Sequence, residues 1–164
     1  MIINPDLIIG GFISALKIAF GLRMEPHEII HERLLAPHRY PDLPSGKSAV
    51  YVFSLTDKSR TLAGPNRVLK VGRAGINSQQ RFKFQHYKLG SAKSTLAGAV
   101  KNNRILYSYI GYDTSLENLD SWLRSNTDRD HFFLNPDRQN MLPLLEVYVR
   151  GILGPVYEGS LTGE

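Results

Sequence analysis

The chain has 164 residues, of which 42% are hydrophobic and 21% are charged, and it contains no cysteine. This composition excludes a disordered chain, a disulfide scaffold, a thiolate zinc site and a cysteine nucleophile. The formal net charge of +5 favours an anionic partner, such as nucleic acid, an anionic membrane or an acidic protein. The length suits one domain with an appendage, and the lack of cysteine fits a reducing compartment, so we expect a cytoplasmic protein.

The N-terminal segment is an apolar run over residues 7–22. It is shorter than the stretch of about 20 residues that a membrane span needs, and Lys17 interrupts it. Asp6 precedes the run, whereas a signal peptide begins with positive charge. We therefore expect a helix that packs on the rest of the protein or forms a subunit contact, with no membrane association.

Residues 26–36 predict a short helix, because Pro26 suits a first helical turn. On such a helix His27 and His31 would lie four residues apart, a spacing that can hold a metal ion. The sequence offers no evident third ligand nearby, so a solvated helix face is the preferred interpretation. The next residues, 37–48, are rich in proline and predict an extended linker.

The core of the fold is predicted from residue 49 onward. The apolar, β-branched stretches 49–55 and 67–72 predict two strands, paired as a hairpin with a long connection. Residues 104–112 alternate and predict a third strand, and 131–134 are a candidate for a further short strand. Helices are predicted over residues 77–89, 91–103, 115–126 and 140–154. The result is an α/β (α+β) fold with a small, mainly antiparallel three-stranded sheet flanked by helices.

Side chains that can carry chemistry gather around the end of the second predicted strand. Gly72 ends this strand, Arg81 follows it by nine residues, and His86 follows Arg81 by five. Tyr51 lies in the first predicted strand and Glu146 in the last predicted helix. These groups are ordered along the chain as a tyrosine, a glycine, an arginine, a histidine and a late glutamate.

The order and spacing resemble the GIY-YIG nuclease superfamily, whose members cleave DNA with one divalent metal ion. The stretch "AVY" at 49–51 resembles the first family motif and supplies Tyr51 as its tyrosine. The stretch "KVG" at 70–72 resembles the second motif, with Lys70 in the place of a tyrosine. The helix arginine, the later histidine and the metal-binding glutamate are matched by Arg81, His86 and Glu146. The resemblance covers residues 48–159.

The resemblance implies a DNA endonuclease that uses Mg²⁺ or Mn²⁺, with one ion per active site. It implies that Tyr51 positions and activates the attacking water. Arg81 and Lys70 would contact the phosphate, and Glu146 would hold the metal ion, which prefers oxygen ligands.

His86 fits this pattern less closely than the other residues. Five residues of a regular helix correspond to a rotation that leaves His86 about 140° from Arg81, so the two would not share one face. A bend in the helix would restore the pairing, and otherwise Gln85 or Tyr87 would take part. A histidine on the surface is the structural alternative.

Two departures from the family pattern leave other functions open. Lys70 replaces a tyrosine, and "GPVYEG" after the last helix lacks a family asparagine, which Asn135, Asn140 or the backbone would have to replace. Both departures favour the alternative of a non-catalytic module that binds DNA or protein on the same fold. A basic structural or regulatory protein with accidental motif matches is the third alternative, in which the matched side chains would be scattered.

Further cations predict the surface that would follow the DNA backbone. They are Arg73, Lys83, Lys88, Lys93 and Lys101. The nuclease-like domain is predicted over residues 46–164, after an N-terminal helical extension and linker over residues 1–45. The extension is a candidate for DNA contact, for packing on the domain, or for a homodimer contact that would let two single-ion sites cut both strands.

Overall fold

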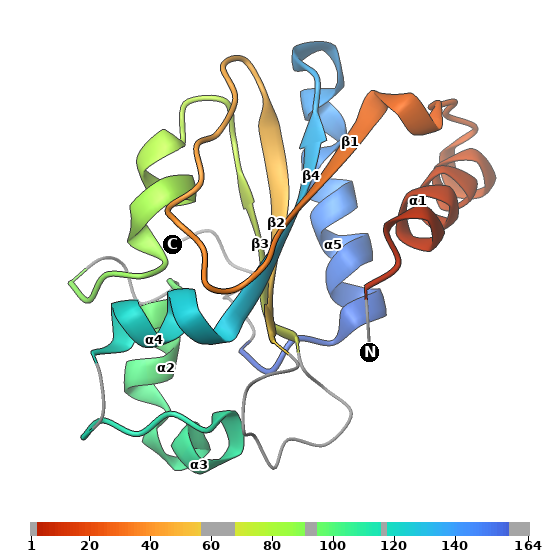
Figure 1. Cartoon of the computed structure of the whole chain (residues 1–164). Coiled ribbons are helices and arrows are strands. Elements are labelled where there is room, and N and C mark those ends of the chain that lie inside the picture. The colour runs from red at the N-terminus through yellow and green to blue at the C-terminus, as the bar shows by residue number, and fades with distance from the viewer. Residues whose placement is uncertain (1–2, 57–67, 91–94, 116–117, 158–164) are drawn as a thin grey trace.

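The computed structural model describes residues 3–56, 68–90, 95–115 and 118–157, where one antiparallel sheet lies between two layers of helices (Figure 1). The four strands have the order β1-β4-β2-β3. They are β1 (Ile29–Leu34), β2 (Ser48–Leu55), β3 (Val68–Ala74) and β4 (Thr127–Leu134). The α+β class is confirmed, whereas the sheet has four strands and not the three that were predicted.

Five α-helices and four shorter helical turns complete the described chain. The α-helices are α1 (Pro5–Phe20), α2 (Leu96–Asn102), α3 (Tyr107–Ile110), α4 (Leu119–Asn126) and α5 (Leu142–Leu153). The turns are η1 (Pro26–Glu28), the π-helical η2 (Arg81–Gln85), η3 (Arg104–Leu106) and η4 (Pro136–Met141). None of the described helices has the length and apolar character that a membrane crossing requires.

Each face of the sheet has its own hydrophobic core. On one face, α1 and α5 cover a core in which Leu145 joins Val50 and Val52 (Figure 1). On the other face, η2, α2 and α4 cover a core that contains Tyr51 and Phe53. Successive residues of a strand point to opposite faces, so β2 divides its side chains between the two cores and all of its residues are buried.

The prediction of a helix over residues 26–36 is wrong. Pro26 starts only the single turn η1, and the chain then forms β1, which pairs with β4 from Ile29 opposite Leu134 to Leu34 opposite Arg129. The reason is tertiary, because β4 lies inside the sheet and needs hydrogen-bond partners on both sides. Part of the predicted extension therefore contributes a strand to the sheet.

The strand predicted over residues 104–112 is also wrong, because this segment forms η3 and α3. Gly111, with φ of 73°, ends α3, as left-handed glycines often do at helix C-termini. The rings of Tyr107 and Tyr112 lie 5.0 Å apart and pack against the core that contains Tyr51. The alternating aromatic residues therefore reflect the packing of short helical turns and not the pleat of a strand.

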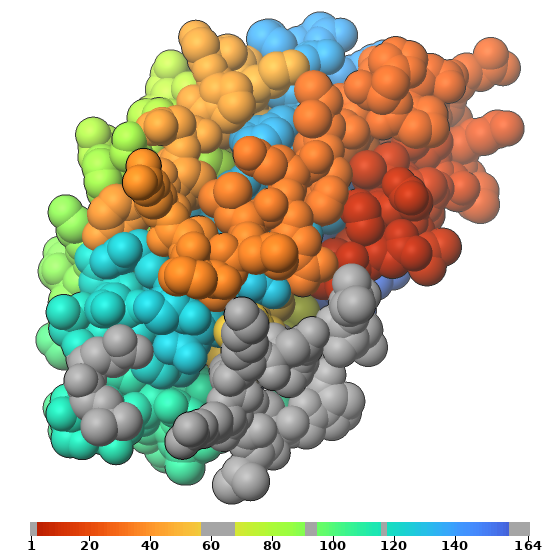
Figure 2. Space-filling model, viewed as in Figure 1, coloured from red at the N-terminus to blue at the C-terminus, as the bar shows by residue number. Residues whose placement is uncertain are grey.

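Most of the remaining elements agree in type with their predictions. The helix predicted over residues 77–89 is an exception, because the chain forms mainly the short π-helical turn η2 there and continues in turns. β2 and β3 form the predicted hairpin, and the short strand predicted at 131–134 is the C-terminal half of β4. The apolar N-terminal run forms α1, and the last predicted helix is α5. The segment between β1 and β2 lies on the face of the molecule that Figure 2 shows, and its residues His38 and Leu43 are buried.

Candidate active site

Tyr51 and Gly72 face each other on the neighbouring strands β2 and β3. The Tyr51 ring lies over Gly72, because a Cβ atom at position 72 would come within 2.5 Å of the Tyr51 hydroxyl oxygen and 2.7 Å of two ring carbons. Close-packed interiors do not tolerate such contacts. The position of the Tyr51 ring therefore requires glycine at position 72, and the hydroxyl is carried towards the edge strand of the sheet.

We expect Gly72→Ala to lower the free energy of unfolding by about 1–3 kcal/mol, because the added methyl group displaces the buried Tyr51 ring. Urea unfolding measures the change. Gly151→Ala in α5 is the matched control, since a Cβ atom there meets nothing within 4 Å and alanine favours a helix. Equal stability of Gly72→Ala and the wild type would contradict the steric argument.

The Tyr51 side chain is fully buried, and its hydroxyl has no hydrogen-bond partner of regular geometry among the described residues. Burial raises the pKa of Tyr51, and the charge of Glu146 adds to this effect. The positive charges of Arg81, which approaches the hydroxyl, and of Arg129 act in the opposite direction because they favour the phenolate. Tyr51 is therefore protonated at neutral pH, and further positive charge is needed to ionise it.

Lys70 lies opposite Phe53 next to the bulge of the β2–β3 hairpin, and only 3% of it is exposed. Burial, followed by the positive charges of Arg150 and Arg81, lowers the pKa of Lys70 to about 8, although Glu146 opposes the shift. Interactions of this kind weaken with distance, so these four side chains occupy one region. Lys70 is mostly charged at pH 7 and loses its charge slightly above that pH.

Glu146 lies on α5, and both of its carboxylate oxygens are in ion pairs with arginines. Oε2 is 3.4 Å from Nε of Arg73 on β3, and Oε1 accepts a hydrogen bond of 3.0 Å from Nη2 of Arg150, one turn along α5. The Glu146 side chain is 14% exposed, so solvent screens these pairs only in part. With Lys70 and Arg81 in the same region, the site has an excess of positive charge.

The π-helical turn η2 explains how Arg81 and His86 come together. A π-helix closes its hydrogen bonds between residues i and i+5, so residues five positions apart are nearly aligned along the helix axis. The offset of about 140° that a regular helix imposes is reduced in this way. His86 is fully buried, and its ring centroid lies 4.6 Å from that of Tyr51. The alternative of a surface histidine is therefore wrong.

His86 is a neutral side chain in this environment. Its Nδ1 accepts a hydrogen bond of 3.2 Å from the N–H of Leu96, which places the proton of the neutral ring on Nε2. Burial, followed by the charges of Arg129, Lys70 and Arg81, holds the pKa of His86 well below its ordinary value. His86 therefore packs against the Tyr51 ring as a neutral side chain and does not act as a cation on the phosphate.

Arg129 on β4 is a buried residue of the site that the sequence analysis did not identify. Its guanidinium carbon lies 5.3 Å from the ring centroid of Tyr51, 4.8 Å from that of Phe53 and 4.4 Å from that of Phe82. Nη1 donates to the Tyr87 hydroxyl at 3.1 Å, and Nη2 donates to the Phe82 carbonyl oxygen at 2.7 Å. The sequence carries no signal for it, because Arg129 lies between two aspartates in a charged stretch that does not resemble a buried strand.

The predicted DNA-contacting cations are only partly grouped at this site. Arg73 belongs to it through the ion pair with Glu146. Lys83 and Lys88 lie 5.3 and 5.0 Å from the centroid of the Phe84 ring, on or just after η2. Lys101 is exposed on α2, and Lys93 lies outside the described residues.

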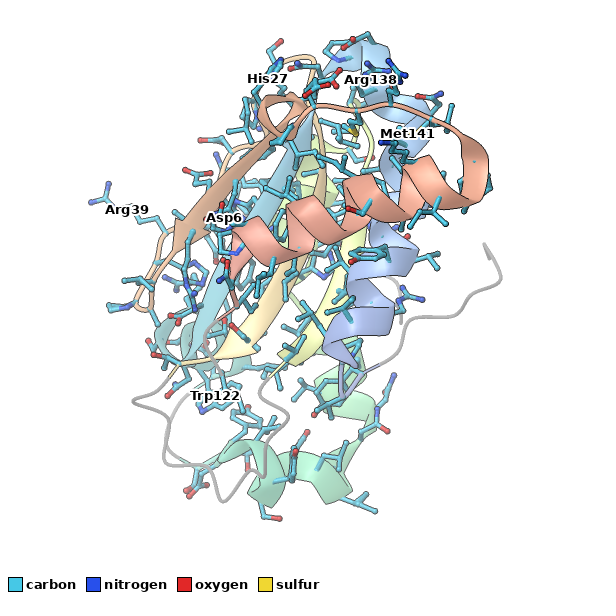
Figure 3. The ribbon with its side chains drawn as sticks, turned by 90° about the vertical axis from the view of Figure 1, so that its right-hand side faces the viewer. Asp6, His27, Arg39, Trp122, Arg138 and Met141 are labelled. Carbon is cyan, nitrogen blue, oxygen red and sulfur yellow. The ribbon has the colours of Figure 1, made fainter. Side chains whose placement is uncertain are left out.

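The two histidines considered for metal binding do not lie on one helix, as that hypothesis required. His27 lies in η1 at the same end of the molecule as Arg138 (Figure 3), whereas Nε2 of His31 is 2.8 Å from Oδ1 of the buried Asp130. Within the described ranges, no three His, Asp or Glu side chains are grouped to hold a metal ion. Asn135 accepts a hydrogen bond from Lys47, so its side-chain oxygen is already engaged.

Comparisons with known proteins do not extend this description. No protein-family model matches the chain, and no curated protein and no solved structure matches it. The resemblance to GIY-YIG nucleases therefore stays a prediction from the sequence motifs.

Proposed function

We propose that the protein is a divalent-metal-dependent DNA endonuclease of the GIY-YIG type. The observation that carries the proposal is the grouping of Tyr51, Lys70, Arg81 and Glu146. These residues come from β2, β3, η2 and α5, and the charges of Arg81 and Glu146 act on both Tyr51 and Lys70. Accidental motif matches would leave them scattered, so the grouping argues against a structural or regulatory protein.

The charge of the site suits a phosphodiester substrate. Arg73 and Arg150 pair with the carboxylate of Glu146, and the charges of Arg150, Arg81 and Glu146 all act on Lys70. The guanidinium group of arginine is a planar fork of donors that matches the oxygens of a phosphate. Arg81 is exposed and Arg73 is partly exposed, so both can meet a DNA backbone that approaches the edge strand β3.

Each side chain has a distinct part in the proposed reaction. The Tyr51 hydroxyl is buried and protonated in the free protein. It can therefore take the proton of the attacking water only as a phenolate, after substrate binding has admitted water to it and further positive charge has ionised it. Arg81 and Lys70 then stabilise the charge on the phosphoryl oxygens. Arg129 favours the Tyr51 phenolate from the buried side of the ring. His86 packs against the same ring and limits its movement.

Glu146 alone offers a divalent cation no free oxygen, because both of its oxygens are paired with arginines. Together with a DNA phosphate it would supply suitable oxygen ligands for one magnesium or manganese ion. Mg²⁺ usually keeps several waters and is held by one or two carboxylates together with substrate phosphates. Glu146 supplies one carboxylate, and a DNA phosphate would supply further anionic oxygens. When bound, the ion would relieve charge on the phosphate and lower the pKa of a coordinated water.

A non-catalytic module that binds DNA or protein is the second candidate. Two observations favour it, because Lys70 stands where the family has a tyrosine and both oxygens of Glu146 are paired with arginines. Such a module would bind DNA through the same cations without cutting it.

We expect supercoiled plasmid to be nicked or linearised when Mg²⁺ or Mn²⁺ is present and to stay intact with a chelator. The physical reason is that Tyr51, Arg81 and Lys70 can complete the reaction only when charge on the phosphate is also relieved by the ion. Agarose gels measure the products, and a Tyr51→Phe preparation controls for contaminating nucleases. If plasmid, single-stranded DNA and branched DNA all stay uncut while a gel shift shows binding, the binding module is favoured.

The homodimer contact through residues 1–45 stays a prediction. α1 exposes Leu7, Ile18 and Phe20, which are apolar side chains available to a second copy. In a dimer, two single-ion sites would cut the two strands of the duplex.

A further inference from the structure

Two arginines are paired with Glu146, the carboxylate that is proposed to hold the metal ion. Arg73 and Arg150 each engage a different oxygen of the carboxylate, at 3.4 and 3.0 Å. A divalent cation needs the same oxygens as ligands. The two arginines therefore compete with the ion for Glu146 whenever the protein is free of substrate.

The surrounding charges strengthen this competition. Lys70 and Arg81 lie in the same region as the two arginines, so an incoming divalent cation meets four positive charges and one negative charge. Like charges at close range are unfavourable, and partial burial reduces the screening by salt. The free protein therefore presents a site that attracts anions more strongly than metal ions.

A phosphate group can remove the competition. The Arg73 side chain is 47% exposed, so it can turn from Glu146 to a phosphate without leaving a buried charge unpaired. Nε of Arg150 is buried and has no partner among the described residues, so Glu146 satisfies only part of this guanidinium. Arginine binds phosphate oxygens in a bidentate manner, which makes phosphate a strong alternative acceptor.

We propose that Arg73 and Arg150 form a clamp on Glu146 that a DNA phosphate opens, so that metal binding at Glu146 depends on DNA binding. The inference rests on the proposed function, because it assumes that Glu146 is the metal ligand and DNA the substrate. Linkage is reciprocal, so the metal ion tightens DNA binding by the same factor by which DNA tightens metal binding.

The test measures Mn²⁺ binding by electron paramagnetic resonance on the full chain, without turnover. Without DNA, the double variant Arg73→Gln/Arg150→Gln is expected to bind Mn²⁺ about tenfold more tightly than the wild type, the effect of releasing two partly exposed ion pairs. Arg138→Gln is the matched control, because it frees Glu28 from a comparable arginine pair outside the site. It is expected to leave Mn²⁺ affinity unchanged, and adding Glu146→Gln to the double variant is expected to abolish the gain.

A second arm adds a short DNA duplex in the Tyr51→Phe background, which prevents cleavage. The duplex is expected to raise Mn²⁺ affinity when both arginines are present and to raise it much less in the double variant. If the double variant does not fold, the single variant Arg73→Gln replaces it, because this arginine is partly exposed, with an expected gain of about threefold.

Three outcomes would overturn the inference. The first is that the free wild type and the arginine variants bind Mn²⁺ with the same affinity. The second is that the gain in Mn²⁺ affinity persists when Glu146→Gln is added. The third is that DNA raises Mn²⁺ affinity by the same factor with and without the two arginines. Plasmid cleavage separates this inference from the proposed function. If the protein cuts plasmid but its Mn²⁺ affinity does not depend on the two arginines, only the clamp is refuted. If Mn²⁺ affinity depends on the arginines but plasmid stays uncut, only the nuclease activity is refuted.

Discussion

Glu146→Gln is expected to lower the rate of plasmid cleavage by about 10³-fold or more, which corresponds to about 4 kcal/mol in the activation barrier. The substitution keeps the size of the side chain but removes the anionic ligand of the metal ion. Both contributions of the ion, activation of water and relief of charge, are lost together. DNA affinity is expected to persist or rise, because Arg73 and Arg150 are then free to bind phosphates.

Folding of Glu146→Gln is expected to change little. The two arginine pairs are partly exposed, and the loss of such pairs costs about 1 kcal/mol or less each. A plasmid assay, a gel shift and a thermal melt on one preparation measure the three effects. Asp137→Asn is the matched control, because it removes one negative charge from an exposed side chain of η4. Retained cleavage would refute the metal assignment, and lost folding would show that Glu146 is structural.

The parts of the fold that the sequence predicts are those with strong local patterns. β2 is buried on both faces and reads as a continuous apolar run, and α5 combines leucines at helical spacing with Pro143 in its first turn. β1 has no such pattern, because its residues alternate irregularly in burial and its pairing with β4 joins segments about a hundred residues apart in the chain. No local pattern could have revealed that pairing.

In the candidate site, too, the sequence predicts what depends on local motifs and not what depends on tertiary contacts. Motif spacing selects Tyr51, Arg81 and Glu146, and in the structure the charges of Arg81 and Glu146 both act on the Tyr51 hydroxyl. It does not reveal the π-helical turn, since hydrogen bonds between residues i and i+5 leave no compositional signature. It also misses Arg129, whose partners Tyr87 and Phe82 belong to a distant segment of the chain.

Lys70→Met is expected to raise stability at pH 7 while it lowers activity. In the unfolded chain a lysine has a pKa of about 10.4, whereas burial, Arg150 and Arg81 lower the pKa of Lys70 to about 8 in the folded protein. The buried charge therefore opposes folding at pH 7, by an amount on the order of 3 kcal/mol, and methionine removes this cost. Such a trade between stability and activity is common at functional sites.

The pH dependence follows from the lowered pKa of Lys70. Between pH 8 and about 10.4 the unfolded chain binds more protons at this position than the folded protein does, so the wild type gains stability as the pH rises through this range. The stability advantage of Lys70→Met is therefore expected to be full below pH 8 and to shrink towards pH 10. Urea unfolding of both proteins at several pH values measures the difference.

Cleavage by Lys70→Met is expected to be slower by at least about tenfold at pH 7, because one charge-assisted contact to the phosphate is worth about 1.5–3 kcal/mol. The difference in rate is expected to vanish above pH 8, where the wild-type lysine is itself neutral. Lys83→Met is the matched control, because Lys83 pairs with Asp42 on the surface and should show neither a gain in stability nor this pH dependence. A rate difference that grows above pH 8 would show that Lys70 acts as a neutral base and not as a cation on the phosphate.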